Sequence, residues 1–469
     1  MTRKIDQSKA ILVIGGGTWG SSTALHLARR GYKNVTVLDH YYIPSAISAG
    51  NDVNKICDED TYPDSEDDPD FVSRTLAAAC AKGWLEDPLF KPYYHATGYV
   101  AAAHTPAGFK HLEKKELPAS RVGFVRIETP EEFRKTMPEG VLTGDFPGWK
   151  GWQKKSGSGW VEARKALVAT ATEAIRLGVK YICGQPGNVQ RLLFSSPDDG
   201  KTHDIVGVET ADGKQHHASL VILAAGANAD AFLDFKDQLR PTAWTLAHIK
   251  MTAEEAKLYK NLPVLFNVEK GFFMEPDFVN HELKFCDEHP GYCNWVDVPV
   301  TDPVTGKTQT KRRSVPFARS QIPVESEQRM RSFLRDIMPH LAERPFSFAR
   351  ICWCADTVDR KYLIDIHPDH PSLVLACGAS GHGFKHISSI GSFVVDAIEG
   401  KLHPKLKHAM RWRPEQAVGR DWDDVQNRMG DPYAMQDFQK VKEWMPTPDH
   451  SQSSVQLDDG SIKHTGTWK

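Results

Sequence analysis

Long hydrophobic runs are absent from this sequence, and their absence excludes a class of protein. A membrane-spanning helix needs about 20 consecutive apolar residues, and no stretch of the 469 residues approaches that length. Residues 1–7 lack the apolar core of a signal peptide, so we expect no secretory leader. The eight cysteines are scattered, whereas a secreted disulfide scaffold is short and dense in cysteine. We therefore expect no membrane partner and a reducing compartment, the cytoplasm.

A strong charge of one sign is also absent. The formal net charge is -2, so the chain lacks the field that holds nucleic acid or a membrane surface. One basic run, Lys311-Arg312-Arg313, stands among proline, glycine and threonine residues, and we predict a solvated loop at 301–314. The cysteines and histidines lack the spacing of a zinc site, so we expect no metal.

The composition that remains is that of a globular protein, with 40% hydrophobic and 25% charged residues. The length suggests two or three domains of about 150 residues each. Residues 10–39 predict a βαβ unit, with a buried strand at 11–14, a helix at 21–30 and a second strand at 35–38. Further patterns predict an exposed acidic loop at 57–70, a helix at 161–177, strands at 220–226 and 373–378, a helix at 387–399 and a disordered tail from about 446.

The first strand runs into a glycine-rich turn, Gly15-Gly16-Gly17-Thr18-Trp19-Gly20. Gly15 permits the tight turn, Gly17 lets the backbone approach a pyrophosphate, and Gly20 allows close packing of helix on strand. The helix N-terminus then faces the anion. Asp39 ends the next strand about 20 residues later, where a carboxylate can bind ribose hydroxyls and repel a 2′-phosphate. The pattern predicts a dinucleotide site for NAD or FAD and disfavours NADP.

Two later features favour FAD over NAD. A second buried strand ends at Gly226, and a third meets the glycine-rich segment 378–383. Flavoproteins often close around the isoalloxazine ring with distant turns of this kind, whereas an NAD dehydrogenase more often keeps its site in one contiguous domain. An NAD dehydrogenase and a catalytically silent flavin-binding protein remain as alternatives.

Seven segments resemble one family of flavoenzymes. The chain is similar to the fungal fructosyl amino acid oxidases, or amadoriases, of the monomeric sarcosine oxidase group, from residue 10 to about 445. The matching segments are 17–20, 45–55, 145–151, 239–245, 286–291, 350–357 and 378–385.

The resemblance implies an α/β fold of the D-amino-acid-oxidase type. Its FAD-binding Rossmann-like domain is joined to an α+β substrate domain with an antiparallel sheet. We expect the first domain to comprise 1–60, 151–235 and 346–410, the second 61–150 and 236–345, with 411–445 packing on the site and 446–469 forming the tail.

The resemblance also implies an activity. A relative of this family oxidises the C–N bond of a fructosyl amino acid, gives glucosone and the free amino acid, and passes the electrons to dioxygen to form hydrogen peroxide. We expect a monomer, and no peroxisomal address because the chain ends Thr467-Trp468-Lys469. A sarcosine- or pipecolate-type amine oxidase on the same scaffold is the alternative within enzymes.

Family members tether FAD through a cysteine, and the resemblance assigns that role to Cys352. Cys354 is the rival, because residues two apart on a strand point to the same face. The thiolate is the attacking species. Without the resemblance, an inert buried cysteine would be the favoured interpretation of Cys352.

The resemblance places Lys284 above the flavin, where its charge would stabilise the anions of dioxygen reduction. Read without the family, Lys284 would be an exposed lysine of a strand. Lys55, after the turn that wraps the flavin, is its expected partner. The remaining candidates for binding the cofactor are Ser48, Asn51, Gly383, Phe384 and Lys385. Those for binding the substrate are Glu288, Lys385, Arg420 and Trp244. An arginine is suited to the carboxylate of a fructosyl amino acid.

Overall fold

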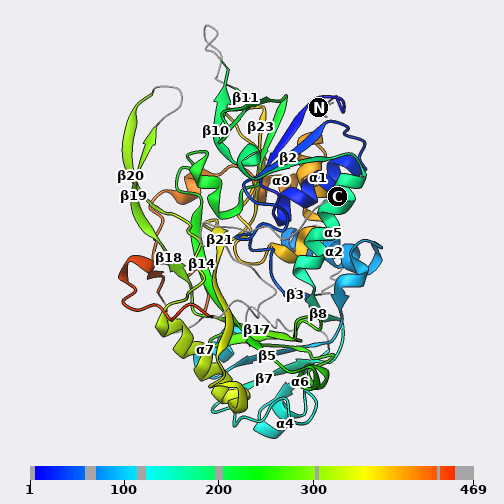
Figure 1. The fold of residues 1–469 in the computed structure, drawn as a ribbon, viewed down its shortest axis with the longest axis vertical. Coiled ribbons are helices and arrows are strands. Elements are labelled where there is room, and N and C mark those ends of the chain that lie inside the picture. The colour runs from blue at the N-terminus through cyan, green and yellow to red at the C-terminus, as the bar shows by residue number, and fades with distance from the viewer. Residues whose placement is uncertain are drawn as a thin grey trace.

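The computed structural model describes residues 6–58, 70–113, 123–195, 204–301, 306–429 and 434–448. Two large sheets organise this part of the chain, one near each end of the molecule (Figure 1). A six-stranded sheet carries the glycine-rich turn, and a ten-stranded sheet carries Lys284 and Cys352.

The six-stranded sheet has the strand order β22-β23-β13-β1-β2-β9. Its strands pair in parallel except at the edge, where β22 runs antiparallel to β23. The predicted βαβ unit is confirmed as β1, α1 and β2. The bounds are β1 Ile11–Ile14, α1 Thr18–Arg29, β2 Val35–Asp39, β9 Lys180–Cys183, β13 Leu220–Leu223, β22 Leu363–Ile366 and β23 Leu373–Cys377.

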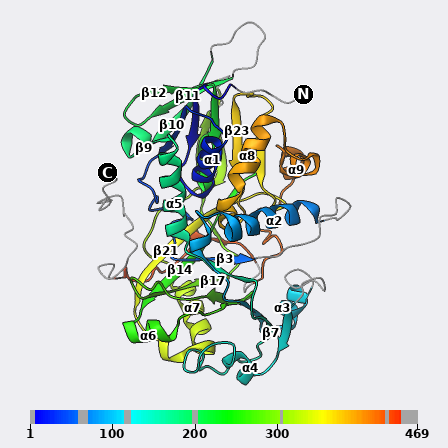
Figure 2. The same cartoon turned by 90° about the vertical axis from the view of Figure 1, so that its right-hand side faces the viewer.

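Both faces of this sheet are covered, which is why its strands are continuously apolar. Ile11 and Val13 pack under a layer in which α1 lies between α5 (Ala163–Arg176) and α8 (Ile390–Glu399), the layer that faces the viewer in Figure 2. Leu12 and Ile14 pack on the opposite side, in a cluster with residues of a three-stranded sheet. That sheet consists of β10 Val189–Phe194, β11 Ile205–Thr210 and β12 Gln215–His217.

The ten-stranded sheet is mostly antiparallel, as the resemblance implied. Its order is β24-β18-β14-β17-β16-β15-β5-β7-β6, and β21 also pairs with β14. A separate hydrophobic core on this sheet includes Phe333 of helix α7. The bounds are β5 Tyr99–Ala103, β6 Phe124–Ile127, β7 Lys150–Lys154, β14 Arg240–Lys250, β15 Val264–Asn267, β16 Gly271–Phe273, β17 Glu282–Asp287, β18 Tyr292–Cys293, β21 Phe346–Asp356, β24 Gln436–Asp437 and α7 Val324–Ile337.

Smaller elements connect the two sheets. A three-stranded sheet in the order β3-β8-β4 lies between them in Figure 2. The bounds are β3 Lys55–Asp58, β4 Tyr94–His95, β8 Ser158–Val161, α2 Phe71–Glu86, α3 Pro106–His111, α4 Pro130–Arg134, α6 Ala253–Leu258 and α9 Pro404–Met410, and the 3₁₀ turns are η1 Lys91–Tyr93, η3 Gln185–Gly187, η4 Gly226–Ala231, η5 Pro339–Leu341, η6 Phe384–Ser388, η7 Pro414–Ala417 and η8 Phe438–Lys440.

The predicted loop at 301–314 is wrong for its described part. Residues 308–314 form β20 (Thr308–Ser314), which pairs with β19 (Trp295–Thr301) in an antiparallel hairpin. The basic run is therefore on a strand, where Lys311 and Arg313 pair with aspartates of the segment that follows β13. Turn-forming residues nearby misled the prediction.

The remaining sequence predictions are confirmed in part. The helix expected at 161–177 is α5. The helix expected at 387–399 is α8, which follows η6. Most of the predicted acidic loop 57–70 and the tail after 448 lie outside the described residues, and residues 57 and 58 belong to β3. Strands β7 and β21 pair into the ten-stranded sheet, whereas the expected boundaries place most of β7 and all of β21 in the FAD-binding domain. The domain boundaries stay a prediction.

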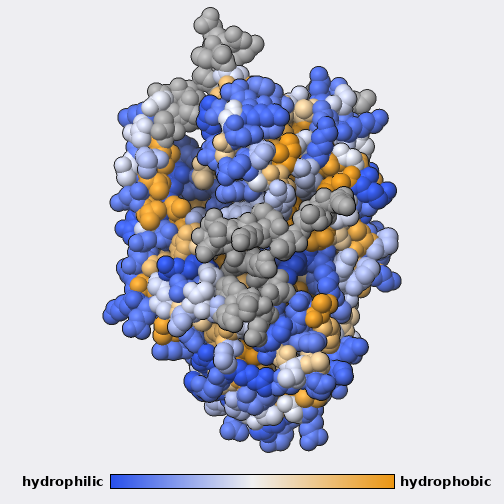
Figure 3. All heavy atoms as spheres, in the orientation of Figure 1, coloured by the Kyte–Doolittle hydropathy of each residue, from blue (hydrophilic) through white to orange (hydrophobic). Residues whose placement is uncertain are grey.

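The described helices include none that is long and apolar enough to cross a membrane. Hydrophilic residues cover most of the face in Figure 3, and they separate the hydrophobic ones into small groups.

Candidate active site

A cavity of about 510 Å³ opens at the carboxyl ends of β1, β2 and β13. Such a position, outside the carboxyl ends of parallel strands, is where α/β sheets bind their ligands. Its walls also come from β21 and from the segment after β20. The lining includes Gly15, Gly17, Thr18, Trp19, Asp39, Ser48, Val189, Gly226, Phe317, Trp353, Cys354 and Gly378.

The glycine-rich turn has the geometry of an anion cradle. Gly15 has φ 98°, and a Cβ there would lie 2.6 Å from the Ala224 carbonyl oxygen. A Cβ at Gly20 would overlap the Gly15 carbonyl oxygen, so no larger residue lets α1 pack so closely on β1. No side chain caps α1 at Gly17, and its first N–H groups therefore remain available to an anion.

Asp39 holds the place expected of a ribose acceptor. Its Oδ2 accepts the Gly16 N–H at 2.7 Å and its Oδ1 accepts the Tyr41 N–H at 2.8 Å. Burial raises the pKa of Asp39 to about 6. Hydroxyl donors from a bound ribose would stabilise the ionised carboxylate. The cradle, the uncapped helix and this carboxylate together fit the dinucleotide part of FAD.

One face of the ten-stranded sheet gathers the predicted chemistry. Cys352 on β21 stands opposite Trp244 on β14, and on β17 Lys284 and Cys286 point to the same side. Cys352 and Phe272 of β16 both pack against a small cluster that contains Cys286. Cys352 and Lys284, which are distant in sequence, therefore lie on the same face of the sheet.

Cys352 and Cys354 have different surroundings on that strand. Cys354 accepts the Gly381 N–H at 2.6 Å, and burial, with the Asp356 carboxylate, raises the pKa of its thiol to about 12. Cys352 instead lies within electrostatic reach of the Lys55 ammonium. The surroundings of Cys354 therefore oppose the thiolate, which is the attacking species.

Lys284 is buried, with its side chain 1% exposed, so the reading as an exposed lysine is wrong. Its Nζ donates to Asp52 Oδ2 at 2.8 Å and to the Asn54 carbonyl at 2.8 Å, and it lies 5.7 Å from the centre of the Phe272 ring. Lys55 Nζ lies 2.7 Å from the same Asp52 oxygen. The two predicted lysines are thus joined through one carboxylate.

A buried arginine, Arg350, and a half-buried one, Arg164, hold the loop that carries Asp52. Arg350 on β21 donates to the Ser48 carbonyl at 3.2 Å, and Arg164 on α5 donates to Asn51 Oδ1 at 2.7 Å. Both side chains belong to elements of other sheets or layers, so the loop between Ser45 and Asn54 is fixed by tertiary contacts.

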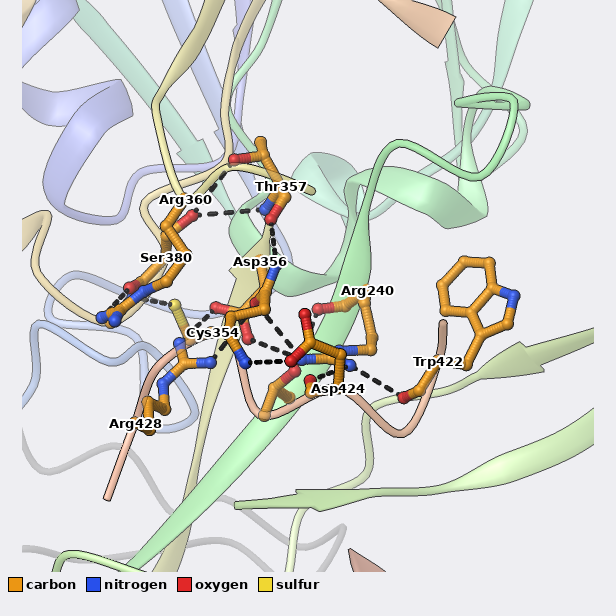
Figure 4. A network of polar contacts seen from close by, with 12 residues as sticks. Arg240, Cys354, Asp356, Thr357, Arg360, Ser380, Trp422, Asp424 and Arg428 are labelled. Carbon is orange, nitrogen blue, oxygen red and sulfur yellow. Dashed lines mark hydrogen bonds and ion pairs between the residues drawn. The ribbon is translucent and has the colours of Figure 1, made fainter. Parts of the chain in front are cut away.

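A second charged network lies around Cys354 and Asp356 (Figure 4). The Asp356 carboxylate lies 2.8 Å from Arg428 Nη2 and 3.6 Å from Arg240 Nη2, and these two guanidinium groups lower its pKa to about 2 against the effect of burial. Arg240 also donates to the carbonyls of Trp422 and Asp424, both at 2.8 Å. The network pins the C-terminal segment 420–428 to β14 and β21.

The guanidinium group of Arg428 lies 4.6 Å from the centre of the Trp244 ring. Arg420, predicted to bind the substrate carboxylate, donates instead to the carbonyls of Asp237, Gln238 and Asp356. Burial lowers the pKa of Arg420 to about 10. Arg428 therefore lies beside Trp244 and near Cys354.

The other predicted site residues lie on surrounding turns. The Gly383 carbonyl accepts the Trp19 indole N–H at 3.2 Å, and Phe384 lies against Gly50. Lys385 and Glu288 are half-buried and do not line the described cavity. Their roles stay predictions.

The family model described as FAD dependent oxidoreductase (DAO) matches residues 10–397. The chain resembles the structure of Amadoriase I from Aspergillus fumigatus, at 55% identity and a TM-score of 0.87, covering 95% of this chain and 99% of that chain. This chain belongs to the DAO family of FAD dependent oxidoreductases, in its amadoriase branch.

Other members of the family are similar over most of their length. Amadoriase II of the same organism, a fructosamine oxidase solved in complex with FSA, is 52% identical with a TM-score of 0.87 and covers 95% and 98% of the two chains. The L-saccharopine oxidase of Schizosaccharomyces pombe is 29% identical over 418 residues, which are 87% of this chain and 94% of that protein.

Asp52 and Arg428 are the functional candidates that sequence analysis missed in this amadoriase-branch chain. Asp52 stood inside a matching segment, three residues before Lys55, and that proximity was an available signal. Arg428 gave none, because it follows an irregular segment and reaches Trp244 only in the folded chain.

Proposed function

We propose that this protein oxidises fructosyl amino acids, giving glucosone, the free amino acid and hydrogen peroxide. One observation carries the proposal: the cavity that fits FAD adjoins a sheet face carrying Cys352, Trp244 and the buried Lys284, in a chain 55% identical to Amadoriase I. A cytoplasmic location and a monomeric state remain predictions.

The chain's own residues would hold FAD by several contacts. Gly15, Gly17 and the N-terminus of α1 suit the pyrophosphate, and Asp39 suits the ribose hydroxyls. Cys352 is the proposed covalent tether, since it lies within electrostatic reach of Lys55, whereas burial and the Asp356 carboxylate raise the pKa of the rival Cys354 thiol to about 12. When bound, FAD accepts two electrons from the C–N bond and delivers them to dioxygen.

The substrate pocket needs cations because a fructosyl amino acid carries a carboxylate. We assign this role to Arg428 ahead of Arg420, because the Arg428 guanidinium, which also pairs with Asp356, lies 4.6 Å from the centre of the Trp244 ring, whereas Arg420 donates to three backbone carbonyls. A planar guanidinium can donate two parallel hydrogen bonds to a carboxylate. Trp244 would then form one wall, with Lys385 and Glu288 as further candidates.

Lys284 supplies fixed positive charge in a site with little water. Charge that is already oriented, in a poorly solvated place, stabilises anions that form during a reaction without further reorganisation. Lys284 would thereby assist the transfer of electrons to dioxygen, with Lys55 as its neighbour.

A substrate panel tests the proposal. We expect the purified protein to be yellow and to release hydrogen peroxide with fructosyl-valine or fructosyl-ε-lysine, and far more slowly with sarcosine, pipecolate or saccharopine. Peroxide release and free amino acid would be measured together, because the reaction yields both in equal amount. A preference for sarcosine or pipecolate would assign the protein to the alternative amine oxidases, and a colourless protein would contradict both.

A further inference from the structure

One carboxylate oxygen contacts both lysines of the site. Asp52 Oδ2 lies 2.8 Å from Lys284 Nζ and 2.7 Å from Lys55 Nζ, and the Asp52 side chain is only 2% exposed. The two lysines come from β17 and β3, strands of different sheets. Asp52 therefore stands at the contact between these two sheets, with a cation on each side.

The position of Asp52 is determined by its backbone and its second oxygen. Oδ1 accepts the Val53 N–H at 2.8 Å, and the Asp52 carbonyl accepts the Arg164 N–H of α5 at 2.9 Å. Arg350 holds the preceding turn through the Ser48 carbonyl. These contacts fix the position of the Asp52 carboxylate, so the two ammonium groups are oriented by it.

The charges on Asp52 and Lys55 depend on one another. The Lys284, Lys55 and Arg350 cations hold the pKa of Asp52 well below its usual range, in spite of its burial. Burial opposes the charge on Lys55, yet the Asp52 carboxylate keeps the pKa of Lys55 above its usual value. Removing one partner of a buried ion pair leaves an uncompensated charge, which is strongly unfavourable.

The contacts also orient the two ammonium groups. Lys284 donates one N–H to Asp52 and one to the Asn54 carbonyl, and among the described residues no hydrogen bond uses the third of its donors, which can serve a reacting molecule. Lys55 is held by Asp52 beside the Cys352 thiol. A neutral residue at position 52 would free both ammonium groups to turn elsewhere or to lose a proton.

We propose that Asp52 is a positioning residue that aims Lys284 at the site of dioxygen reduction and Lys55 at the Cys352 thiol. This inference rests on the proposed function. Asp52 itself contacts neither substrate nor the reacting atoms, and it acts through the two lysines.

The test is Asp52→Asn, an isosteric change that removes the charge. Stopped-flow measurements on the flavin-loaded protein would separate reduction by fructosyl-valine from reoxidation by dioxygen. We expect the second-order rate constant for dioxygen to fall about tenfold or more, while the reduction rate stays within about threefold. The fraction of flavin that remains bound after acid precipitation should also fall, because Asp52 no longer holds Lys55 near Cys352.

A matched control is Glu269→Gln, which neutralises another carboxylate that is 2% exposed, in the turn before β16. Glu269 accepts the His104 N–H at 2.8 Å and, in the contacts described, touches neither lysine. This variant should leave both rate constants and the covalent fraction unchanged. It separates the specific effect of Asp52 from a general loss of stability.

Asp52→Glu keeps the charge but displaces it, so it keeps the inference testable if the asparagine variant does not fold. We expect it to retain covalent flavin and to lower the dioxygen rate constant severalfold. Wild-type dioxygen reactivity in Asp52→Asn, or in Asp52→Glu, would overturn the inference and leave the proposed function intact. Failure of the wild-type protein to oxidise any fructosyl amino acid would instead overturn the proposed function.

Discussion

At the scale of single residues, the site depends on charges placed where water is scarce. Lys284 and Asp52 are 1% and 2% exposed, and each is tolerated because the other compensates it. A buried ion pair of this kind adds little to stability compared with an apolar pair of similar volume. The presence of this ion pair in the site is better explained by function. The sequence pattern alone could not reveal the pair, because the strand that carries Lys284 resembles any alternating strand.

Replacing Lys284 by methionine should separate the two halves of the reaction. Methionine fills a similar volume without the charge, so reduction by a fructosyl amino acid should survive while reoxidation by dioxygen slows by about two to three orders of magnitude. Anaerobic reduction and aerobic reoxidation would be followed through the flavin absorbance. Lys250→Met, on the neighbouring strand β14, is the control and should leave both phases unchanged. Unaltered dioxygen reactivity in Lys284→Met would remove this lysine from its assigned role.

At the scale of elements, the hairpin β19–β20 joins the rim of the cofactor cavity. Arg313 donates to the Asp230 carbonyl at 2.8 Å, and its Nε lies 3.4 Å from Asp230 Oδ2. Asp230 belongs to η4, whose first residue, Gly226, lines the cavity. Lys311 Nζ adds a contact of 2.6 Å to Asp234. The basic run thus docks the hairpin onto the segment that follows β13.

Arg313→Met should therefore destabilise the protein more than Arg312→Met. Arg313 is largely buried and bonded, and its loss leaves Asp230 partly unpaired, so we expect the free energy of unfolding to fall by about 1–2 kcal/mol. Arg312, exposed on the same strand, should change it by less than about 0.5 kcal/mol. Denaturant unfolding of the two variants beside the wild type measures the difference. Equal effects would show that the hairpin is not held by these ion pairs.

At the scale of the whole molecule, the cavity lies between the six-stranded sheet and the ten-stranded sheet. The glycine-rich turn belongs to the six-stranded sheet, whereas Trp353 and Cys354 come from β21, which pairs with β14 of the ten-stranded sheet. A flavin held by the first and bonded to Cys352 of the second would connect both. Its tether should therefore matter for the stability of the entire fold.

Cys352→Ser and Cys354→Ser test this connection. Acid precipitation should release the flavin from Cys352→Ser and leave it attached in Cys354→Ser, because the buried Cys354 thiol, with its pKa raised to about 12, resists ionisation. Added FAD should then stabilise Cys352→Ser alone, by about 2.7 kcal/mol at a hundredfold excess over Kd. Melting temperatures with and without added FAD measure this effect. Flavin that stays bound in Cys352→Ser would move the tether to another residue.

The sequence by itself determined the dinucleotide turn at Gly15, Gly17 and Gly20, the carboxylate at Asp39 and the strands on either side. These features depend on local rules: a tight turn needs glycine, a doubly covered strand is continuously apolar, and both are visible in a short window. Resemblance added Cys352 and Lys284, whose types alone are common in any sheet. Tertiary structure decided the partnership of Asp52 with two lysines, the place of Arg428 beside Trp244, and the strand at 308–314. Each of these depends on contacts between segments far apart in the chain, and such contacts leave no periodic trace in the sequence.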